Sequence, residues 1–243
     1  MLYLIGIGLN DEKDISVKGL EAVRKCESVY LESYTSKLNC SVGALEKVYG
    51  KKIIVADRDL VEKKAEETIL KDAKTKETAL LIIGDVFGAT THIDILMRAK
   101  KAGVKTKIIH NASILTAVGI TGLELYKFGK TTSIPFNNKD IKSPVSVLKS
   151  NQSIGFHTLF LLDLDPKNNK FLTIGDAAKY LIKEGVESDK LAVACAQLGS
   201  DAPFIKSAKL RDIKNLKIEK YPQCLIIPGN LHFMEEESLK LYS

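Results

Sequence analysis

The sequence has no tryptophan and only 6 prolines among its 243 residues. With so few prolines, long proline-rich linkers between folded parts are not expected. No apolar run approaches the roughly 20 residues that a membrane-spanning helix needs. The start also lacks the basic and apolar regions of a secretory signal, because Met1–Ile7 is followed at once by a polar segment at 10–13. We therefore expect a cytoplasmic protein without a membrane anchor.

The spacing of the cysteines and histidines is not typical of disulfides or of metal sites. The four cysteines, Cys26, Cys40, Cys195 and Cys224, include no C-x-x-C pair, and two of them lie in apolar runs. They are typical of buried free thiols in a reducing compartment. The 4 histidines are scattered, without the spacing of metal ligands. The sequence predicts neither a disulfide nor a bound metal.

Length and charge leave two broad questions open. The chain could form one large domain or two of about 120 residues, each able to bury its own core. Its formal net charge is +6, and basic residues gather at Arg98, Lys100, Lys101, Lys105 and Lys107. No aromatic residues interleave with them, so we expect no direct nucleic-acid binding. The cluster is either a solvated helix face or a surface for a large anionic partner.

Apolar runs in the first half alternate with helix-like stretches. Strands are expected at 2–7, 28–31, 53–55, 79–83 and 104–109, with helices from 16, at 42–49, at 60–73 and from 91. This alternation predicts a parallel sheet covered by helices. Gly6 and Gly8 resemble part of a dinucleotide fingerprint, but Asp11 stands where its third glycine should be, so that fold is rejected.

The loop after the strand at 79–83 is the stretch around which the chain is organised. Gly84, Asp85 and Gly88 let the backbone approach a ligand at the carboxyl end of the strand, where open α/β sheets bind ligands. A positive φ within this loop is expected. Thr91 is expected to cap the next helix, with Asp94 as its acidic partner.

Apolar spacing assigns an inward face to that next helix, formed mainly by Ile93, Leu96 and Met97 and widened by Ile95 and Ala99. After the next strand, Ser113 is placed to cap a helix at 114–121, whose free amides could hold a carboxylate or a hydroxyl-rich ligand. The alternative is a plain helix cap.

From about residue 112 the pattern changes. Strands are expected at 131–136, 156–162, 191–196, 205–210 and 224–227, with fewer helices between them, chiefly 174–183 and one from 231. The sequence therefore predicts two α/β domains, 1–111 with a parallel sheet and 112–243 with a mixed sheet.

Seven segments, taken in order, resemble one enzyme family. They are L-Y-L-I-G-I-G-L-N, V-Y-L-E-S-Y-T-S, A-D-R-D-L-V-E, G-D-V-F-G-A-T-T-H, I-I-H-N-A-S, G-F-H-T-L-F-L-L-D and P-G-N-L-H-F. Together they resemble the diphthine synthases, in the tetrapyrrole-methylase-like class of S-adenosylmethionine-dependent methyltransferases. The segments extend from residue 1 to about 234, so the resemblance covers nearly the whole chain.

The resemblance implies two α/β domains with S-adenosylmethionine in the cleft between them, and usually a homodimer. It implies that the protein methylates the 3-amino-3-carboxypropyl group on a histidine of translation elongation factor 2, an intermediate of diphthamide formation, leaving S-adenosylhomocysteine. The cofactor contacts that it implies are Leu9, Asp85, Gly88, Ser113, Ile114, Leu162, Leu198 and Gln223.

Two positions depart from the family pattern. Val86 replaces a usual proline and loses a fixed φ. Gln223 replaces a usual histidine, so it can keep a hydrogen bond but cannot titrate, or its backbone alone binds.

Methyl transfer to an amine requires an unprotonated nucleophile and therefore a base or a desolvating pocket, whereas a carboxylate needs no base. No constellation in the sequence names such a base, and the sequence leaves open whether transfer ends at the trimethylated amine or continues to a methyl ester. The G-A-T-T-H spelling favours the ester-forming type. The alternatives are a methyltransferase for precorrin or uroporphyrinogen, and a non-catalytic protein that binds elongation factor 2.

Overall fold

The computed structural model describes residues 1–243, and their contacts divide the chain into two compact units, Met1–Leu115 and Thr116–Ser243. The first unit contains a five-stranded sheet, and the second contains another five-stranded sheet and a two-stranded hairpin. The expected domain boundary after residue 111 lies close to this division. That 1–111 and 112–243 are the domains of the protein stays a prediction.

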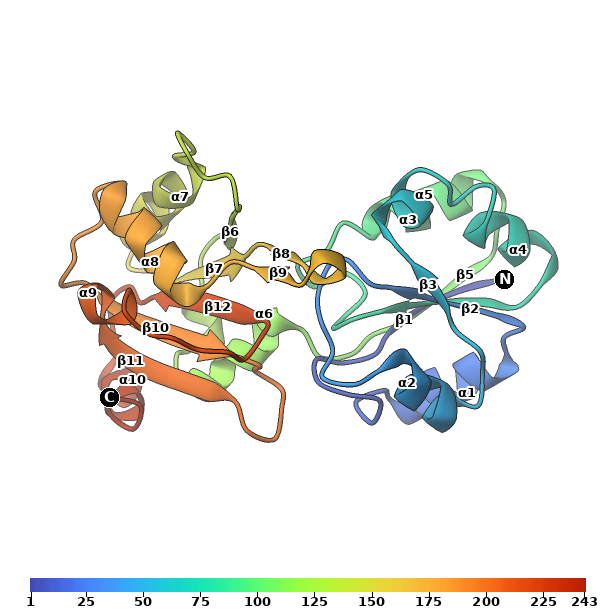
Figure 1. Ribbon diagram of the computed structural model, residues 1–243, viewed down its shortest axis with the longest axis horizontal. Helices are drawn as coiled ribbons and strands as arrows, with labels where there is room; N and C mark the ends of the chain where they lie inside the picture. The colour runs from blue at the N-terminus through green and yellow to red at the C-terminus, as the bar shows by residue number, and fades with distance from the viewer. The chain divides into compact units, whose positions relative to one another are not determined.

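The first unit is an alternation of strands and helices (Figure 1). Its elements are β1 (Leu2–Gly6), α1 (Val17–Lys25), β2 (Ser28–Glu32), α2 (Val42–Tyr49), β3 (Ile54–Ala56), α3 (Arg58–Glu62), α4 (Ile69–Thr75), β4 (Thr78–Ile82), α5 (Ile93–Lys101) and β5 (Thr106–Ile109). The sheet has the order β3-β2-β4-β1-β5 and every pair in it is parallel. The predicted parallel sheet is confirmed.

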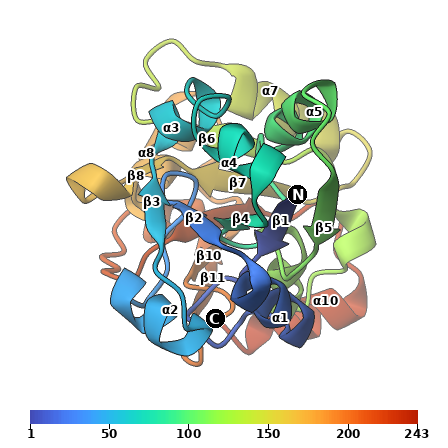
Figure 2. The ribbon, with the colours of Figure 1, turned by 90° about the vertical axis from the view of Figure 1, so that its right-hand side faces the viewer.

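Both faces of this sheet are covered by helices, with α3, α4 and α5 on one side and α1 and α2 on the other (Figure 2). Alternate residues of β1 enter the two cores: Leu2 and Leu4 pack with α3–α5, whereas Tyr3 and Ile5 pack with α1 and α2. Strands buried on both faces have to be apolar throughout, which explains the uninterrupted apolar runs in the sequence.

The single helix expected at 60–73 is wrong, because the chain forms α3 and α4 with turns between them. The Thr68 hydroxyl donates to the carbonyl oxygen of Lys64 at 2.7 Å. Such a side-chain bond to nearby backbone competes with regular helix hydrogen bonding. A buried Ala65 lies in the interruption and keeps it packed on the core.

Helix α5 is rotated relative to the expectation. Its buried residues are Ile95, Leu96 and Ala99, while Ile93 and Met97 are about half exposed. His92, which is the N-cap residue and is buried, begins this stripe, so the inward positions follow the helical spacing i, i+3, i+4 and i+7. The predicted face was wrong because it began at the first apolar residue and left the histidine out.

The predicted cap of α5 is also wrong. The N-cap is His92, which makes no side-chain capping bond, and Thr91 contributes only its carbonyl oxygen to the amide of Asp94. The Asp94 carboxylate instead pairs with Arg98 at 3.1 Å, and Arg98 also binds Glu66. Arg98 therefore does not belong to a free basic surface.

The second unit begins within α6 (Ile114–Ala117). Its further elements are the 3-10 turns η1 (Val118–Thr121) and η2 (Leu125–Lys127), β6 (Thr132–Ile134), α7 (Ser143–Gln152), β7 (Thr158–Leu162), β8 (Leu164–Asp165), η3 (Pro166–Asn168), β9 (Lys170–Phe171), α8 (Ile174–Lys183), β10 (Leu191–Ala196), β11 (Phe204–Lys209), α9 (Leu210–Ile213), β12 (Gln223–Ile227) and α10 (Phe233–Lys240). The expected helix at 114–121 is thus a short α-helix continued by a 3-10 turn.

The larger sheet of this unit has the order β11-β10-β12-β7-β6. All its pairs are antiparallel except β6 with β7, so the predicted mixed sheet is confirmed. Helices α7, α8 and α9 pack on one face, and α10 lies on the other (Figure 1). Across β10 and β12, Cys195 stands opposite Cys224, and all four cysteines are free thiols.

A buried carboxylate, Glu235 in α10, ties the second unit together. One of its oxygens accepts from the Glu124 amide at 2.9 Å, and the other accepts from the His232 amide at 2.8 Å and from the Lys127 ammonium. Burial opposes ionisation of Glu235, but these donors outweigh it and lower its pKa to about 2.

His157 completes this network in one defined tautomer. Its Nδ1 accepts from the Gly229 amide at 2.9 Å, so Nε2 carries the proton that is donated to Glu235 at 2.8 Å. Burial lowers the pKa of His157 despite the neighbouring carboxylate, which keeps the ring neutral. The histidines of G-F-H-T-L-F and P-G-N-L-H-F therefore have structural roles.

None of the helices combines the length and the apolar character needed to cross a bilayer.

Candidate active site

Three loops of the first unit meet where β4, β1 and β5 end. Gly84 donates its amide to the Gly8 carbonyl at 2.7 Å, which joins the first two loops. A side chain at Gly6 would lie 2.6 Å from the Gly84 oxygen and 2.9 Å from the Asn111 side chain. Because glycine has no side chain, Gly6 allows the three loops to approach one another. Gly84 adopts a positive φ of +85°, a conformation that glycine tolerates best.

Asp85 holds the β4 loop against the β5 loop. Its Oδ1 accepts from the amides of Phe87 at 2.9 Å and Gly88 at 3.2 Å. Its Oδ2 accepts from the Asn111 amide at 3.0 Å and lies 2.9 Å from Nδ1 of His110. Burial opposes its charge, but the donated hydrogen bonds are stronger and lower the pKa of Asp85. Asp85 is thus an ionised carboxylate that shapes both loops.

Gly88 and Ser113, both expected at the cofactor, lie against each other. A side chain on Gly88 would place its Cβ 2.3 Å from Oγ of Ser113, closer than real atoms approach. The positive φ expected in this loop is confirmed at Gly84 and at Ala89, where φ is 60°, and Gly88 itself does not adopt it. Glycine is needed at residue 88 for space. Ser113 in turn accepts from the Leu115 amide at 3.2 Å, at the start of α6.

Leu9 is the remaining predicted contact of the first unit. Its amide donates to the Asp14 carboxylate at 3.0 Å, and its side chain lies near Gly84. With Ile114 directly after Ser113, the structure brings all five predicted residues of this unit onto adjoining loops: Leu9, Asp85, Gly88, Ser113 and Ile114. Their contact with a cofactor stays a prediction.

The other three predicted residues share one end of the second sheet. Leu162 ends β7, Leu198 follows β10, and Gln223 begins β12. Because β12 runs antiparallel to both neighbours, these positions lie at the same edge. The structure therefore groups the eight predicted residues into five on the first unit and three on the second.

The Gln223 side chain is fully engaged within its own unit. Its oxygen accepts from the Ile174 amide at 2.8 Å, and its nitrogen donates to the carbonyls of Ile218 at 2.8 Å and Lys220 at 2.9 Å. An amide with these three partners has little capacity left for a ligand. Of the two interpretations left open by the sequence, the geometry favours a backbone contact.

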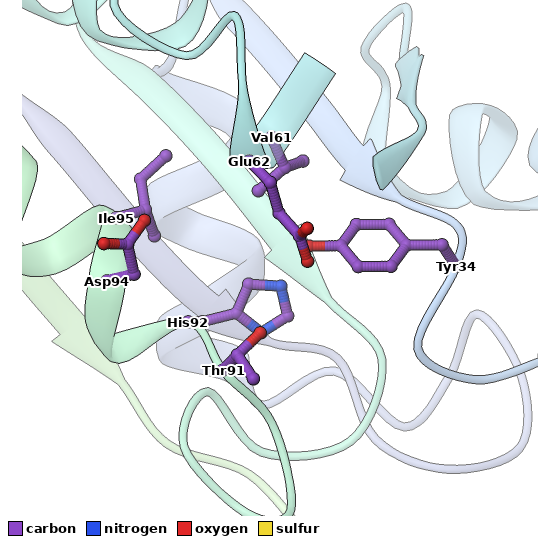
Figure 3. A pocket seen from close by; sticks show the side chains of 7 residues that line it. All are labelled: Tyr34, Val61, Glu62, Thr91, His92, Asp94 and Ile95. Carbon is purple, nitrogen blue, oxygen red and sulfur yellow. The ribbon is translucent and has the colours of Figure 1, made fainter. Parts of the chain in front are cut away.

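A pocket of about 330 Å³ in the first unit contains residues that the sequence did not single out (Figure 3). It is lined by Tyr34, Val61, Glu62, Thr91, His92, Asp94 and Ile95. Both ring nitrogens of His92 and the hydroxyl of Tyr34 are buried without any hydrogen-bond partner. Both residues stand in segments that carried the family resemblance, but no local pattern showed that they meet.

No group of three or more histidine, cysteine, aspartate or glutamate side chains is arranged to hold a metal ion.

Comparison with known proteins agrees with the two-sheet architecture. The family model of Tetrapyrrole (Corrin/Porphyrin) Methylases matches residues 1–214. A human protein named diphthine methyl ester synthase is 43% identical, over 100% of this chain and 95% of that protein. A diphthine synthase of the archaeon Methanocella arvoryzae is 40% identical, over 99% of this chain and 97% of that protein.

A solved structure is similar over the same extent. The crystal structure of a diphthine synthase superimposes with a TM-score of 0.94 at 42% identity, covering 100% of this chain and 95% of that one. With this match and the full-length identities, the chain belongs to the tetrapyrrole (corrin/porphyrin) methylase family, in its diphthine synthase group, and is an S-adenosylmethionine-dependent methyltransferase.

Proposed function

We propose that this chain methylates the 3-amino-3-carboxypropyl group on a histidine of translation elongation factor 2 in diphthamide biosynthesis, and that transfer continues to the methyl ester. The observation that carries the proposal is the identity of about 40% over the full chain with proteins named diphthine synthase or diphthine methyl ester synthase. The relatives of human and mouse carry the methyl ester in their names. These names support formation of the methyl ester, and so does the sequence segment G-A-T-T-H.

The loops of the first unit fit S-adenosylmethionine. Gly84 has no side chain, and Gly88 packs directly on Ser113. The backbone at these strand ends is therefore open to a ligand, and this is where α/β sheets bind ligands. The amides there are held in place by Asp85. We expect Leu9, Asp85, Gly88, Ser113 and Ile114 to hold the cofactor, which supplies an electrophilic methyl group. The resemblance adds Leu162, Leu198 and the Gln223 backbone.

The protein's own task is to orient and desolvate the acceptor. Alignment of reacting groups lowers barriers by about 7–11 kcal/mol in well-oriented systems. Asp85 contributes by fixing two loops at once, since each of its oxygens has two donors around it. Its ionised state makes it an orienting group.

The test is direct transfer by the full-length protein. Elongation factor 2 carrying the 3-amino-3-carboxypropyl histidine would be incubated with labelled S-adenosylmethionine, and the modified peptide would be analysed by mass spectrometry. We expect four methyl groups, the last of them released by mild base as an ester is. Three base-stable methyl groups would contradict the ester, and binding of the factor without transfer would contradict the enzyme activity.

A tetrapyrrole acceptor is the second candidate, because the matching family model is named for tetrapyrrole methylases. A parallel reaction with uroporphyrinogen or a precorrin is expected to yield no labelled product. Labelling of the macrocycle, with none on elongation factor 2, would replace the proposed substrate.

We further propose that the protein acts as a homodimer in the cytoplasm, as the resemblance implies. Light scattering after size exclusion is expected to give twice the chain mass of 26.8 kDa. A monomer mass at micromolar concentration would contradict this.

A further inference from the structure

The pocket beside α5 contains an unexplained buried imidazole. His92 is only 2% exposed, and neither of its ring nitrogens has a partner. Buried polar groups in native proteins are nearly always hydrogen-bonded, and each exception needs a reason. The Tyr34 hydroxyl, in the same pocket, has no partner either. Two such groups beside one pocket leave hydrogen-bonding capacity that a ligand entering the pocket could use (Figure 3).

The charge of the pocket selects the kind of ligand. Glu62 and Asp94 line it, and each is paired with an arginine that does not line it: Arg58 is 3.7 Å from Glu62 and lies over the Tyr34 ring, and Arg98 is 3.1 Å from Asp94. A ligand with only negative charge would meet two acidic side chains there and is disfavoured, so the carboxylate of an amino-acid-like arm has to point away from Glu62 and Asp94. A primary amine, which carries a positive charge and hydrogen-bond donors, matches both the acids and the free acceptors.

The pocket and the loops assigned to the cofactor are connected through the chain and the sheet. His92 ends the segment that begins with Asp85 and Gly88, and β2, which precedes Tyr34, pairs with β4. Glu32, at the end of β2, accepts from the Ile83 amide at 3.2 Å and so anchors the start of that loop. Strands β2 and β4 are neighbours, so the pocket and the loops stand at the same end of one sheet.

The state of His92 suits proton acceptance. The titratable and charged groups near its ring are Glu32 of β2, Tyr34 of the following loop, Glu62 of α3 and Asp94 of α5, and the two acids of the pocket are paired with Arg58 and Arg98. Burial lowers the pKa of His92 more than Glu32 and Glu62 raise it, so the ring is neutral at physiological pH. A neutral imidazole has one ring nitrogen that accepts a proton.

We propose that this pocket is the acceptor subsite, in which the amino group of the modified histidine arm binds between Tyr34 and the acidic residues and gives a proton to His92. The inference rests on the proposed function and deepens it. The ammonium N–H bond breaks and its proton moves to the imidazole. The freed lone pair then forms the N–C bond to the methyl group, and the electron pair of the C–S bond returns to sulfur. His92 then passes its proton to solvent by way of the pocket, whose Glu62 and Asp94 carboxylates are partly exposed, before the next amine methylation.

With this role, His92 is needed for methylation of the amine but not for methylation of the carboxylate. A carboxylate attacks without losing a proton, so His92 is needed for methylation of nitrogen and is not needed for formation of the ester. A histidine that merely supported the fold would affect both steps equally.

The experiment compares wild-type protein with His92→Asn and, as a matched control, His232→Asn. His232 is exposed in the second unit, its backbone bond to Glu235 is kept in the variant, and asparagine can replace its ring as the cap of α10. We expect His92→Asn to bind S-adenosylhomocysteine within about twofold of wild type by calorimetry. Its rate of amine methylation should fall roughly 100-fold or more, the usual range for a lost general base. Ester formation on an acceptor that is already trimethylated should stay within about threefold.

The pH profile supplies an independent readout. The kcat/KM of the wild-type protein for amine methylation should decrease as the pH falls through the pKa of His92. This acidic limb of the pH profile should be absent in His92→Asn. An NMR titration of the free protein, with the His92 signal assigned through the variant, should show this ring titrating below 6.5, the ordinary histidine value. A His92→Asn variant with wild-type amine methylation, or with both steps reduced alike, would overturn the inference and leave the proposed function standing.

Tyr34→Phe keeps the test decisive if His92→Asn does not fold, because it removes only a hydroxyl without a partner. We expect unchanged thermal stability and a KM for the factor at least fivefold higher. An unchanged KM would overturn the subsite. Absence of transfer by the wild-type protein would instead contradict the proposed function itself.

Discussion

Replacing Glu235 by glutamine is expected to destabilise the second unit strongly. The pKa of Glu235 lies at about 2 in the folded protein against 4.5 for an ordinary glutamate. A difference of about 2.5 pKa units corresponds to about 3 kcal/mol in favour of the ionised side chain. Glutamine has the same shape without the charge. It also turns an amide nitrogen towards one of the two donor pairs, so we expect a loss of about 3–5 kcal/mol, as for other broken buried ion pairs.

The stabilisation by Glu235 is expected to decrease at low pH. Because the folded pKa lies below the unfolded one, ionised Glu235 stabilises the fold fully above about pH 4.5, and this stabilisation is lost as the pH falls towards about 2. Urea unfolding at about pH 7, 5 and 3 should therefore show a gap between wild type and Glu235→Gln that is constant at the two higher values and smaller at the lowest.

The control is Glu237→Gln on the same helix, since Glu237 is exposed and pairs only with Lys240. Its effect should stay within about 0.5 kcal/mol. A Glu235→Gln gap below about 1 kcal/mol at neutral pH, or one that does not narrow in acid, would refute the reasoning from the buried network.

Three further substitutions test the site and the surface. Gly88→Val should lower the affinity for S-adenosylhomocysteine roughly tenfold or more, about 1.4 kcal/mol, because its side chain displaces Ser113, and calorimetry measures the loss. Gln223→Leu should destabilise the protein by about 1–3 kcal/mol in urea unfolding, since it leaves one amide and two carbonyls without their partner, while cofactor affinity stays within about threefold. Joint reversal of Lys100 and Lys101 to glutamate should raise the apparent KM for elongation factor 2 at low salt and have little effect at high salt.

Each of these three predictions has a control or an outcome that would contradict it. Gly43→Ala, where a new Cβ meets only Ser41 at 3.7 Å, should leave cofactor affinity unchanged, so a similar loss there would remove the steric explanation. Wild-type stability of Gln223→Leu would show that its hydrogen bonds are dispensable. An unchanged KM at low salt would leave the two lysines as a solvated helix face.

Most of the first sheet could be predicted from local pattern. A strand buried on both faces must be apolar along its whole length, and β1 and β4 are. Helix starts were equally local: Ser16 caps α1 by accepting from the Gly19 amide, because that bond joins residues three apart. The features that local pattern predicted wrongly depended on tertiary contacts. Thr91 looked like a cap, but the N-cap is His92, whose buried ring is the first member of the inward stripe.

The sequence by itself determined the alternation of strands and helices in the first unit, the family, and the loop that begins at Gly84, because each depends on residues that are neighbours along the chain. Only the tertiary structure decided which groups meet across the sheet. It placed Gly88 against Ser113 for reasons of space, and it engaged the Gln223 side chain within its own unit. It also brought Tyr34 to His92, more than fifty residues further along, with ring centroids 6.2 Å apart. Contacts between residues so distant in sequence follow from strand order, because neighbouring parallel strands bring their loops to one edge of the sheet.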